Sequence, residues 1–338
     1  MVNNTKHYLI LLSTLLLLGG CVSQSANSPA LKTTTMMTND PTKTTHCFGR
    51  YLLDLPTDTT IKAGYEYAAA KVKTQHDVSE NMFNKIVSNR EAELKALQLD
   101  RGGSWFIDKT ELSPERIHMT AWTSQFGQYI VLNENFVHIP EHNIMYTRAG
   151  KGDDEKIPEH IKLNDDVLTE YRYRAEGEIP TGVGFCFENG FFASNLPAEE
   201  EVSAGFFFPQ HPNMTFSLTT FLTGNPDQPL LDRNSGLMGQ LFGLLTGSGN
   251  IIRKGQHNIG PLEGQELLVR VKDEQGEMQY QFVWESQGKK NSIEFPFISF
   301  SLRTGVEWKG PKAIQSDEEA LELWDSVLNS LRLRPGAV

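Results

Sequence analysis

The fold of this chain depends on the stretch CFGRYLLDLP, Cys47–Pro56, because a looser version returns as CFENGFFASNLP, Cys186–Pro197. Both copies begin with Cys-Phe and end with Leu-Pro. The apolar and aromatic residues between these ends favour a short strand, and proline closes it because proline cannot donate to a sheet ladder. The repetition predicts two related halves. Two buried strands of ordinary composition would give the same pattern.

The start of the chain has the pattern of an exported lipoprotein. Lys6 precedes the apolar core Leu9–Leu18, which is followed by Gly19-Gly20-Cys21. This apolar run is too short to span a bilayer and therefore predicts a signal peptide over residues 1–20. Cys21 is the expected lipidation site. A cleaved signal followed by an incidental cysteine is the simpler alternative.

The polar residues after Cys21 predict a flexible tether. Residues 21–45 are rich in Ser, Thr, Asn and Pro and show no apolar period. In lipoprotein sorting, Asp after the lipidated cysteine often retains the protein at the inner membrane. Val22 occupies that position here, so we expect an outer-membrane anchor facing the periplasm.

Cys47 and Cys186 remain once Cys21 is assigned to the lipid. An even number of cysteines in an exported chain predicts one disulfide, which would join the two halves. A free thiol nucleophile is the alternative, because His46 precedes Cys47.

The charge of the chain excludes one class of partner. The sequence has 31 Lys and Arg against 42 Asp and Glu, a net charge of −11, which argues against nucleic acid binding. Two acidic clusters are candidate partner-binding residues, because they could steer the chain toward a basic surface. They are Asp153, Asp154 and Glu155, and Glu199, Glu200 and Glu201. Solvated loops would have the same composition.

The periodicity of apolar residues predicts an α+β fold. Asp77 and Glu80 form a capping pair before an amphipathic helix, and Ser316 and Glu319 form a capping box before the last one. Short β-rich runs between turn residues fill most of the remainder. We therefore expect two related domains, residues 46–178 and 179–338. Each would be a mostly antiparallel sheet with one long helix packed on it.

The glycine-rich segment 236–249 contains Leu241 and Phe242, which could form an apolar finger for a partner's cleft. A mobile loop with a short apolar helix is the alternative. The segment has neither a Gly-x-Ser-x-Gly elbow nor a phosphate loop. His138 and His142 have no third ligand nearby in the sequence and are expected to be surface residues. The sequence therefore predicts no catalytic residue, metal, cofactor or small-molecule substrate.

Together these features resemble the periplasmic immunity lipoproteins that neutralise type VI secretion lipase effectors. The resemblance is carried by the lipoprotein start and tether, GRYLLDLP at 49–56, GFCFENGF at 184–191, LWDS at 323–326 and LRLRP at 331–335. It implies two α+β domains, arranged like a claw, that grip a phospholipase effector and obstruct its active site. It also implies inhibition by binding, with no reaction of its own.

Three functions are therefore compared. The first is an immunity protein for a secreted lipase, with the membrane contacted only through the lipid anchor. The second is a structural or assembly lipoprotein of the bacterial envelope, which the anchor and tether alone would suit. The third is a periplasmic enzyme that uses Cys47 with His46.

Overall fold

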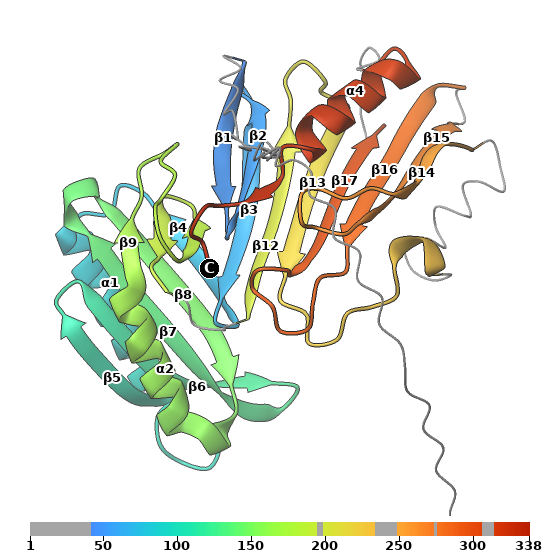
Figure 1. Ribbon diagram of the computed structural model, residues 1–338. Coiled ribbons are helices and arrows are strands. Elements are labelled where there is room, and N and C mark those ends of the chain that lie inside the picture. Colours follow the sequence, from blue (N-terminus) through green and yellow to red (C-terminus); the bar gives the residue numbers. More distant parts are fainter. Residues whose placement is uncertain (1–41, 195–198, 234–248, 274–275, 306–313) are drawn as a thin grey trace, which may run out of the picture. The chain divides into compact units, whose positions relative to one another are not determined.

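The computed structural model describes residues 42–194, 199–233, 249–273, 276–305 and 314–338, and residues 40–338 form one compact unit (Figure 1). The predicted signal peptide and Cys21 lie outside the described residues. The tether predicted to reach Thr45 is too long, because strand β1 already begins at Lys43. In the described part of the chain, no helix has the length and apolarity needed to cross a membrane.

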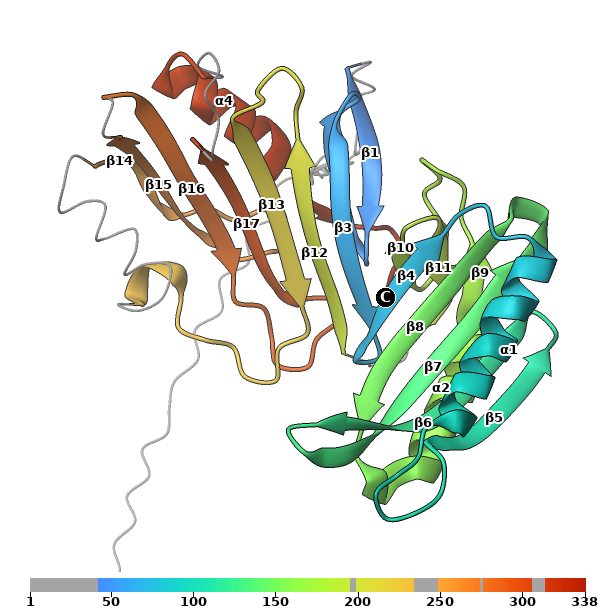
Figure 2. The same ribbon diagram turned by 180° about the vertical axis from the view of Figure 1, so that it is seen from behind.

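One large antiparallel sheet runs through both halves of the sequence (Figures 1 and 2). Its strands are Thr60–Tyr67 (β3), Ala70–Gln75 (β4), Phe106–Ser113 (β5), Arg116–Gln125 (β6), Gln128–Ile139 (β7), Ile144–Gly152 (β8), Glu200–Phe207 (β12), Met214–Phe221 (β13), Asn250–Gln256 (β14), Gln265–Lys272 (β15), Met278–Ser286 (β16) and Phe297–Thr304 (β17). Their order is β14-β15-β16-β17-β13-β12-β3-β4-β8-β7-β6-β5. Strand β12 pairs with β3 over its whole length, so the two halves share one hydrogen-bonded sheet.

The two Cys-Phe stretches form hairpins, although each was expected to be a single strand. The first contains Lys43–Phe48 (β1) and Tyr51–Pro56 (β2), and the second contains Phe185–Phe187 (β10) and Gly190–Phe192 (β11). A two-residue turn separates the strands of each hairpin. Gly49 and Asn189 adopt positive φ values of 59° and 48° in these turns, and glycine and asparagine tolerate this conformation best. Two short strands complete the small sheets: Arg332–Leu333 (β18) beside β2, and Tyr171–Tyr173 (β9) beside β11.

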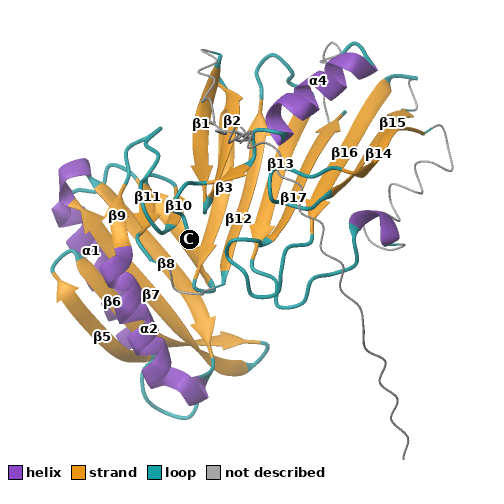
Figure 3. Cartoon of the chain, viewed as in Figure 1, coloured by secondary structure: helices purple, strands orange, loops and turns teal. Residues whose placement is uncertain are grey.

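Three described helices pack on the sheet (Figure 3). They are Glu80–Ala96 (α1), Ile157–Glu170 (α2) and Asp317–Leu328 (α4), and three-residue 3₁₀ helices lie at Pro140–His142 (η1), Asp154–Lys156 (η2) and Leu230–Asp232 (η3). Helix α1 covers the face that contains Met119, whereas α2 lies on the face that contains His118. Neighbouring strand residues point to opposite faces, so the first half has one helix on each face of the sheet. The mostly antiparallel α+β class is confirmed, and α2 is an additional helix in the first half.

The caps of the helices agree only partly with the sequence prediction. The hydroxyl of Ser79 accepts the Met82 N–H at 3.3 Å, so Ser79 caps α1 and the predicted cap at Asp77 is wrong. Asp77 itself adopts a φ of 59° in the preceding turn. At α4, Ser316 accepts the Glu319 N–H at 3.2 Å, as the capping box predicts.

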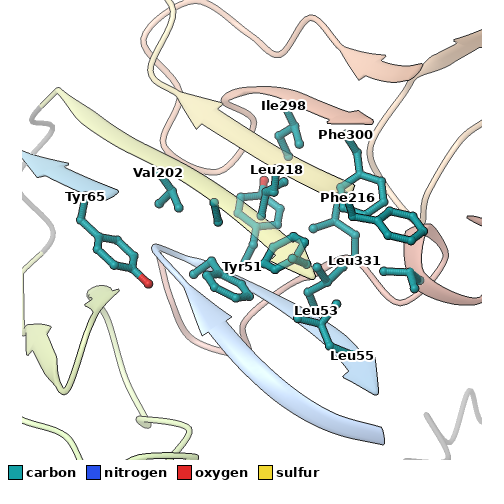
Figure 4. Close-up of a cluster of buried hydrophobic side chains, with 14 of the residues drawn as sticks. Tyr51, Leu53, Leu55, Tyr65, Val202, Phe216, Leu218, Ile298, Phe300 and Leu331 are labelled. Atoms are coloured by element: carbon teal, nitrogen blue, oxygen red, sulfur yellow. The ribbon is translucent and has the colours of Figure 1, made fainter. Parts of the chain in front are cut away.

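The first hairpin is part of the hydrophobic core of the second half. Tyr51 and Leu53 of β2 lie in one buried cluster with Phe216 of β13 and Phe300 of β17 (Figure 4). Trp324 of α4 closes this cluster, with its ring 5.4 Å from that of Phe300. Burying a side chain of this size contributes about 1.5–3 kcal/mol, so these residues hold β2 firmly on the large sheet.

Candidate functional site

A disulfide joins the two hairpins where the halves of the sequence meet. We call this region, around Cys47 and Cys186, the junction. Cys47 and Cys186 are bonded, with their Cα atoms 5.9 Å apart, and both residues are buried. The backbone reinforces the link, because Gly49 N–H donates to the Cys186 carbonyl at 3.0 Å and Cys186 N–H donates to the Gly49 carbonyl at 2.7 Å. The predicted disulfide is therefore present. The alternative of a Cys47 nucleophile is wrong, because its sulfur is bonded and inaccessible.

A buried ion pair lies beside the disulfide and corrects the prediction for Glu200. Arg50 Nε and Nη2 donate to the two carboxylate oxygens of Glu200 at 2.8 and 2.6 Å. Arg50 is 3% exposed and Glu200 is 9% exposed. Burial raises the pKa of Glu200, and the hydrogen bonds and charge of Arg50 oppose that rise. Glu200 therefore fixes the junction internally and is not available to a partner.

Arg334 ties the C-terminal segment to the same junction, and the sequence search did not single it out as a site residue. Its Nη1 donates to the carbonyls of Pro180 and Gly182, and its Nη2 donates to that of Gly184, each at 2.7 Å. Burial, followed by the positive charges of Arg50 and Arg174, lowers the pKa of Arg334 to about 10. The LRLRP motif therefore clamps the segment that leads into the second hairpin.

Three hydrogen-bonded side chains have the residue types of a catalytic triad. His118 Nδ1 lies 3.1 Å from Asp165 Oδ1, and His118 Nε2 lies 3.2 Å from Thr120 Oγ1. His118 is 1% exposed and Thr120 is fully buried beneath α2. Burial lowers the pKa of His118, and the hydrogen bond that its ring donates to the Asp165 carboxylate partly offsets this effect. A substrate cannot reach the Thr120 hydroxyl. These hydrogen-bonded side chains therefore help to pack α2 on the sheet.

A charged groove runs along the junction. Two adjoining hollows, of about 500 and 530 Å³, share Ala63, Tyr65 and Glu188 among their lining residues, and we call them the junction groove. Glu201 lines it and faces Glu66 across the β12–β3 pair. Burial, and then the charge of Glu66, raise the pKa of Glu201. Two carboxylates directly opposite each other repel, and Lys71 of β4, which pairs with Glu66 and lines the same hollow, partly offsets this repulsion.

The remaining predicted acidic residues meet at one end of the large sheet. Asp153, Asp154 and Glu155 are exposed directly after β8, and Glu199 is exposed directly before β12. The Glu199 carbonyl accepts the Ala69 N–H at 3.2 Å in the β3–β4 turn, and Ala70 pairs with Gly150 of β8. We call these four carboxylates the acidic end. No described cation forms an ion pair with them.

The other sequence candidates do not converge on a site. Leu241 and Phe242 lie outside the described residues. His138 was expected on the surface but is only 2% exposed, and its Nε2 donates to the Val78 carbonyl at 2.7 Å. His142 is exposed and stacks on Tyr173. Within the described ranges, no three His, Cys, Asp or Glu side chains are grouped so that they could hold a metal ion.

The architecture is that of a two-part α+β protein whose junction is held by a disulfide and a buried ion pair. Family comparisons place it in a class of immunity proteins. Residues 44–170 match the N-terminal domain of Tle cognate immunity protein 4, and residues 178–336 match its C-terminal domain. The chain belongs to the Tle cognate immunity protein 4 family, and the resemblance read from the sequence is confirmed.

Solved structures agree with this assignment. The apo immunity protein TplEi of the T6SS from Pseudomonas aeruginosa is 30% identical with a TM-score of 0.78, over 87% of this chain and 97% of that one. A chain in the crystal structure of a Tle4–Tli4 complex is also 30% identical with a TM-score of 0.79, over 87% of this chain and 98% of that one. TplEi complexed with an "L" peptide is 29% identical with a TM-score of 0.74, over 87% of this chain and 99% of that one. No curated protein matches the sequence.

Proposed function

We propose that this chain is an immunity protein that binds a type VI secretion lipase effector and obstructs its active site. The observation that carries the proposal is the match of both halves to the Tle cognate immunity protein 4 domains. The similarity to a chain of the Tle4–Tli4 complex supports it, because that complex pairs an immunity protein with its effector. Inhibition by binding requires no reaction by the chain itself.

The structure supports this function through its rigidity. Binding loses affinity when surface groups must be ordered at the moment of contact. Here one continuous sheet, the Cys47–Cys186 disulfide and the Arg50–Glu200 ion pair fix the two halves before any partner arrives. The acidic end and the junction groove are then preformed surfaces for a basic partner. Asp153, Asp154, Glu155, Glu199 and Glu201 stay predicted contacts in this proposal.

We further propose that the protein is anchored in the periplasm through a lipid on Cys21, with the outer membrane as its destination. Residues 22–42 would then act as a spacer between the lipid and the compact unit. A random coil of this length has an end-to-end distance of about 23–27 Å. The division into domains at residues 178 and 179 also stays a proposal.

A protection experiment tests the function. The test takes as partner a lipase encoded beside the gene of this chain, which we call the neighbouring lipase. Cells that export this lipase to the periplasm are compared with and without the chain. We expect survival only when the chain is present and exported. Equal killing in both strains would refute the proposal. A Cys21→Ser variant with another cleavable export signal separates anchoring from inhibition, because it should bind the lipase but no longer incorporate labelled fatty acid.

A further inference from the structure

The hairpin of β6 and β7 exposes a large aromatic side chain at its tip. Gln125 pairs with Gln128, so Phe126 and Gly127 form a two-residue turn. Phe126 is 97% exposed, whereas Leu112, the next most exposed large apolar residue in the described ranges, is 48% exposed. The hairpin projects past the neighbouring strands at this end of the sheet (Figures 1 and 2). Phe126 thus contributes almost no buried surface to the folded chain.

The backbone at Phe126 is also unfavourable for phenylalanine. Phe126 has a φ of 51° and Gly127 a φ of 78°, so both turn residues are in the left-handed region. Two-residue turns of this kind strongly prefer Asn-Gly, because asparagine tolerates positive φ and a bulky side chain does not. Folding alone would therefore favour asparagine at position 126. An aromatic residue that is both exposed and strained serves a purpose outside the fold.

The order of the strands relates Phe126 to the acidic loop after β8. Lys151 Nζ donates to Gln125 Oε1 at 3.0 Å, which ties the end of β8 to the hairpin. Val131 of β7 pairs with both Trp122 of β6 and Gly152 of β8. Phe126 is four residues beyond Trp122, so at about 3.4 Å per residue it lies about 14 Å along the strands from the start of the acidic loop. The acidic loop and the aromatic tip therefore lie toward the same end of the sheet, and Lys151 is the charged side chain that contacts the hairpin.

The hairpin is braced near its tip, which suits an anchor. The guanidinium carbon of Arg101 lies 4.6 Å from the centre of the Trp122 ring and 5.7 Å from that of Tyr129. Tyr129 Oη also accepts the Asp100 N–H at 3.2 Å. These contacts join the hairpin to the segment after α1. The tip can then present Phe126 with little loss of conformational freedom on binding.

We propose that Phe126 is an anchor residue that enters an apolar pocket on the lipase effector, whose basic rim meets the acidic end. This inference rests on the proposed function. An enzyme that acts on acyl chains must present an apolar cleft, and an exposed ring that fills such a pocket is typical of interface residues that dominate affinity. The acidic end, which lies toward the same end of the sheet as the anchor, would add attraction to a basic rim and speed association.

The test uses the chain without its first 21 residues, which retains the whole compact unit. Binding to the purified neighbouring lipase is measured by calorimetry for the parent, Phe126→Asn and Leu112→Asn. We expect Phe126→Asn to raise Kd at least tenfold while its melting temperature stays equal to or above that of the parent. Leu112 lies on β5, beside the end of β6 that is opposite the hairpin tip, and Leu112→Asn should change Kd less than twofold. Combined Asp153→Asn and Asp154→Asn changes should reduce the dependence of Kd on salt.

Each outcome decides the proposal. A rise in Kd of less than tenfold for Phe126→Asn, or an equal rise in Kd for Leu112→Asn, would contradict the role of Phe126 as an anchor residue. If the dependence of Kd on salt is unchanged in the Asp153 and Asp154 variant, the proposed contact between the acidic end and a basic rim is wrong. If the parent protein itself does not bind the lipase, both the proposed function and the proposed role of Phe126 are refuted.

Discussion

Reduction of the Cys47–Cys186 disulfide should destabilise the protein strongly without changing its native structure. The bond closes a loop with a sequence separation of 139 residues. The chain-entropy relation for such a loop gives about 5 kcal/mol at 25 °C, and loss of a native disulfide typically costs about 2–5 kcal/mol. The native junction keeps its two Gly49–Cys186 backbone hydrogen bonds and the Arg50–Glu200 ion pair. The effect should therefore arise mainly in the unfolded chain.

Urea unfolding of the oxidised and reduced parent measures this effect with identical side chains in both samples. With a slope of about 3 kcal/mol per molar urea for a chain of this size, the midpoint should fall by about 1–2 M. Reduced protein below its midpoint should still bind the lipase with the affinity of the oxidised form. Equal midpoints would refute the stabilising role of the bond. A reduced protein that is fully folded but no longer binds would refute the argument that the backbone hydrogen bonds and the Arg50–Glu200 ion pair maintain the junction without the disulfide.

Three further changes test other parts of the junction. Glu200→Gln should lower the free energy of unfolding by about 3–5 kcal/mol, because it leaves the Arg50 charge buried without its partner; a loss below 1 kcal/mol would contradict this. Gly49→Ala should cost more than about 1 kcal/mol, because φ is 59° and the new Cβ would lie 2.9 Å from two side chains; an unchanged melting temperature would show that the turn can relax. Burial opposes ionisation of Asp54, but hydrogen bonds from Arg332 and Thr45 outweigh it and lower the pKa of Asp54. The stability this gives is present above the unfolded pKa of about 3.9 and is lost as the pH falls further, so melting temperatures between pH 5 and 3 should fall more for the parent than for Asp54→Asn.

The sequence predicted those features that depend on local chemistry. Two cysteines in a chain predicted to be exported indicated the disulfide, and the spacing of Ser316 and Glu319 indicated the start of α4. The Cys-Phe repeat located both hairpins but not their turns. Local apolar composition alone did not distinguish a strand from a tight hairpin at Gly49, where the change of direction depends on a single positive φ.

Features that depend on long-range pairing could not be read from the sequence. Glu199, Glu200 and Glu201 are one cluster in the sequence, yet Glu200 is buried against Arg50 while Glu201 lines the junction groove. Alternation along β12 separates them, and this alternation acts only once the register with β3 is fixed. That Phe126 and the acidic loop lie toward the same end of the sheet likewise follows from the order of its strands.

The central claim is that this chain inhibits a lipase by binding it. The most direct measurement is a titration of lipase activity with the chain from Val22 onward, with Phe126→Asn run in parallel. We expect activity to fall linearly to near zero at a fixed molar ratio with the parent, and to be higher at that ratio, with a less sharp end point, with the variant. Full lipase activity in the presence of excess parent protein would contradict the account.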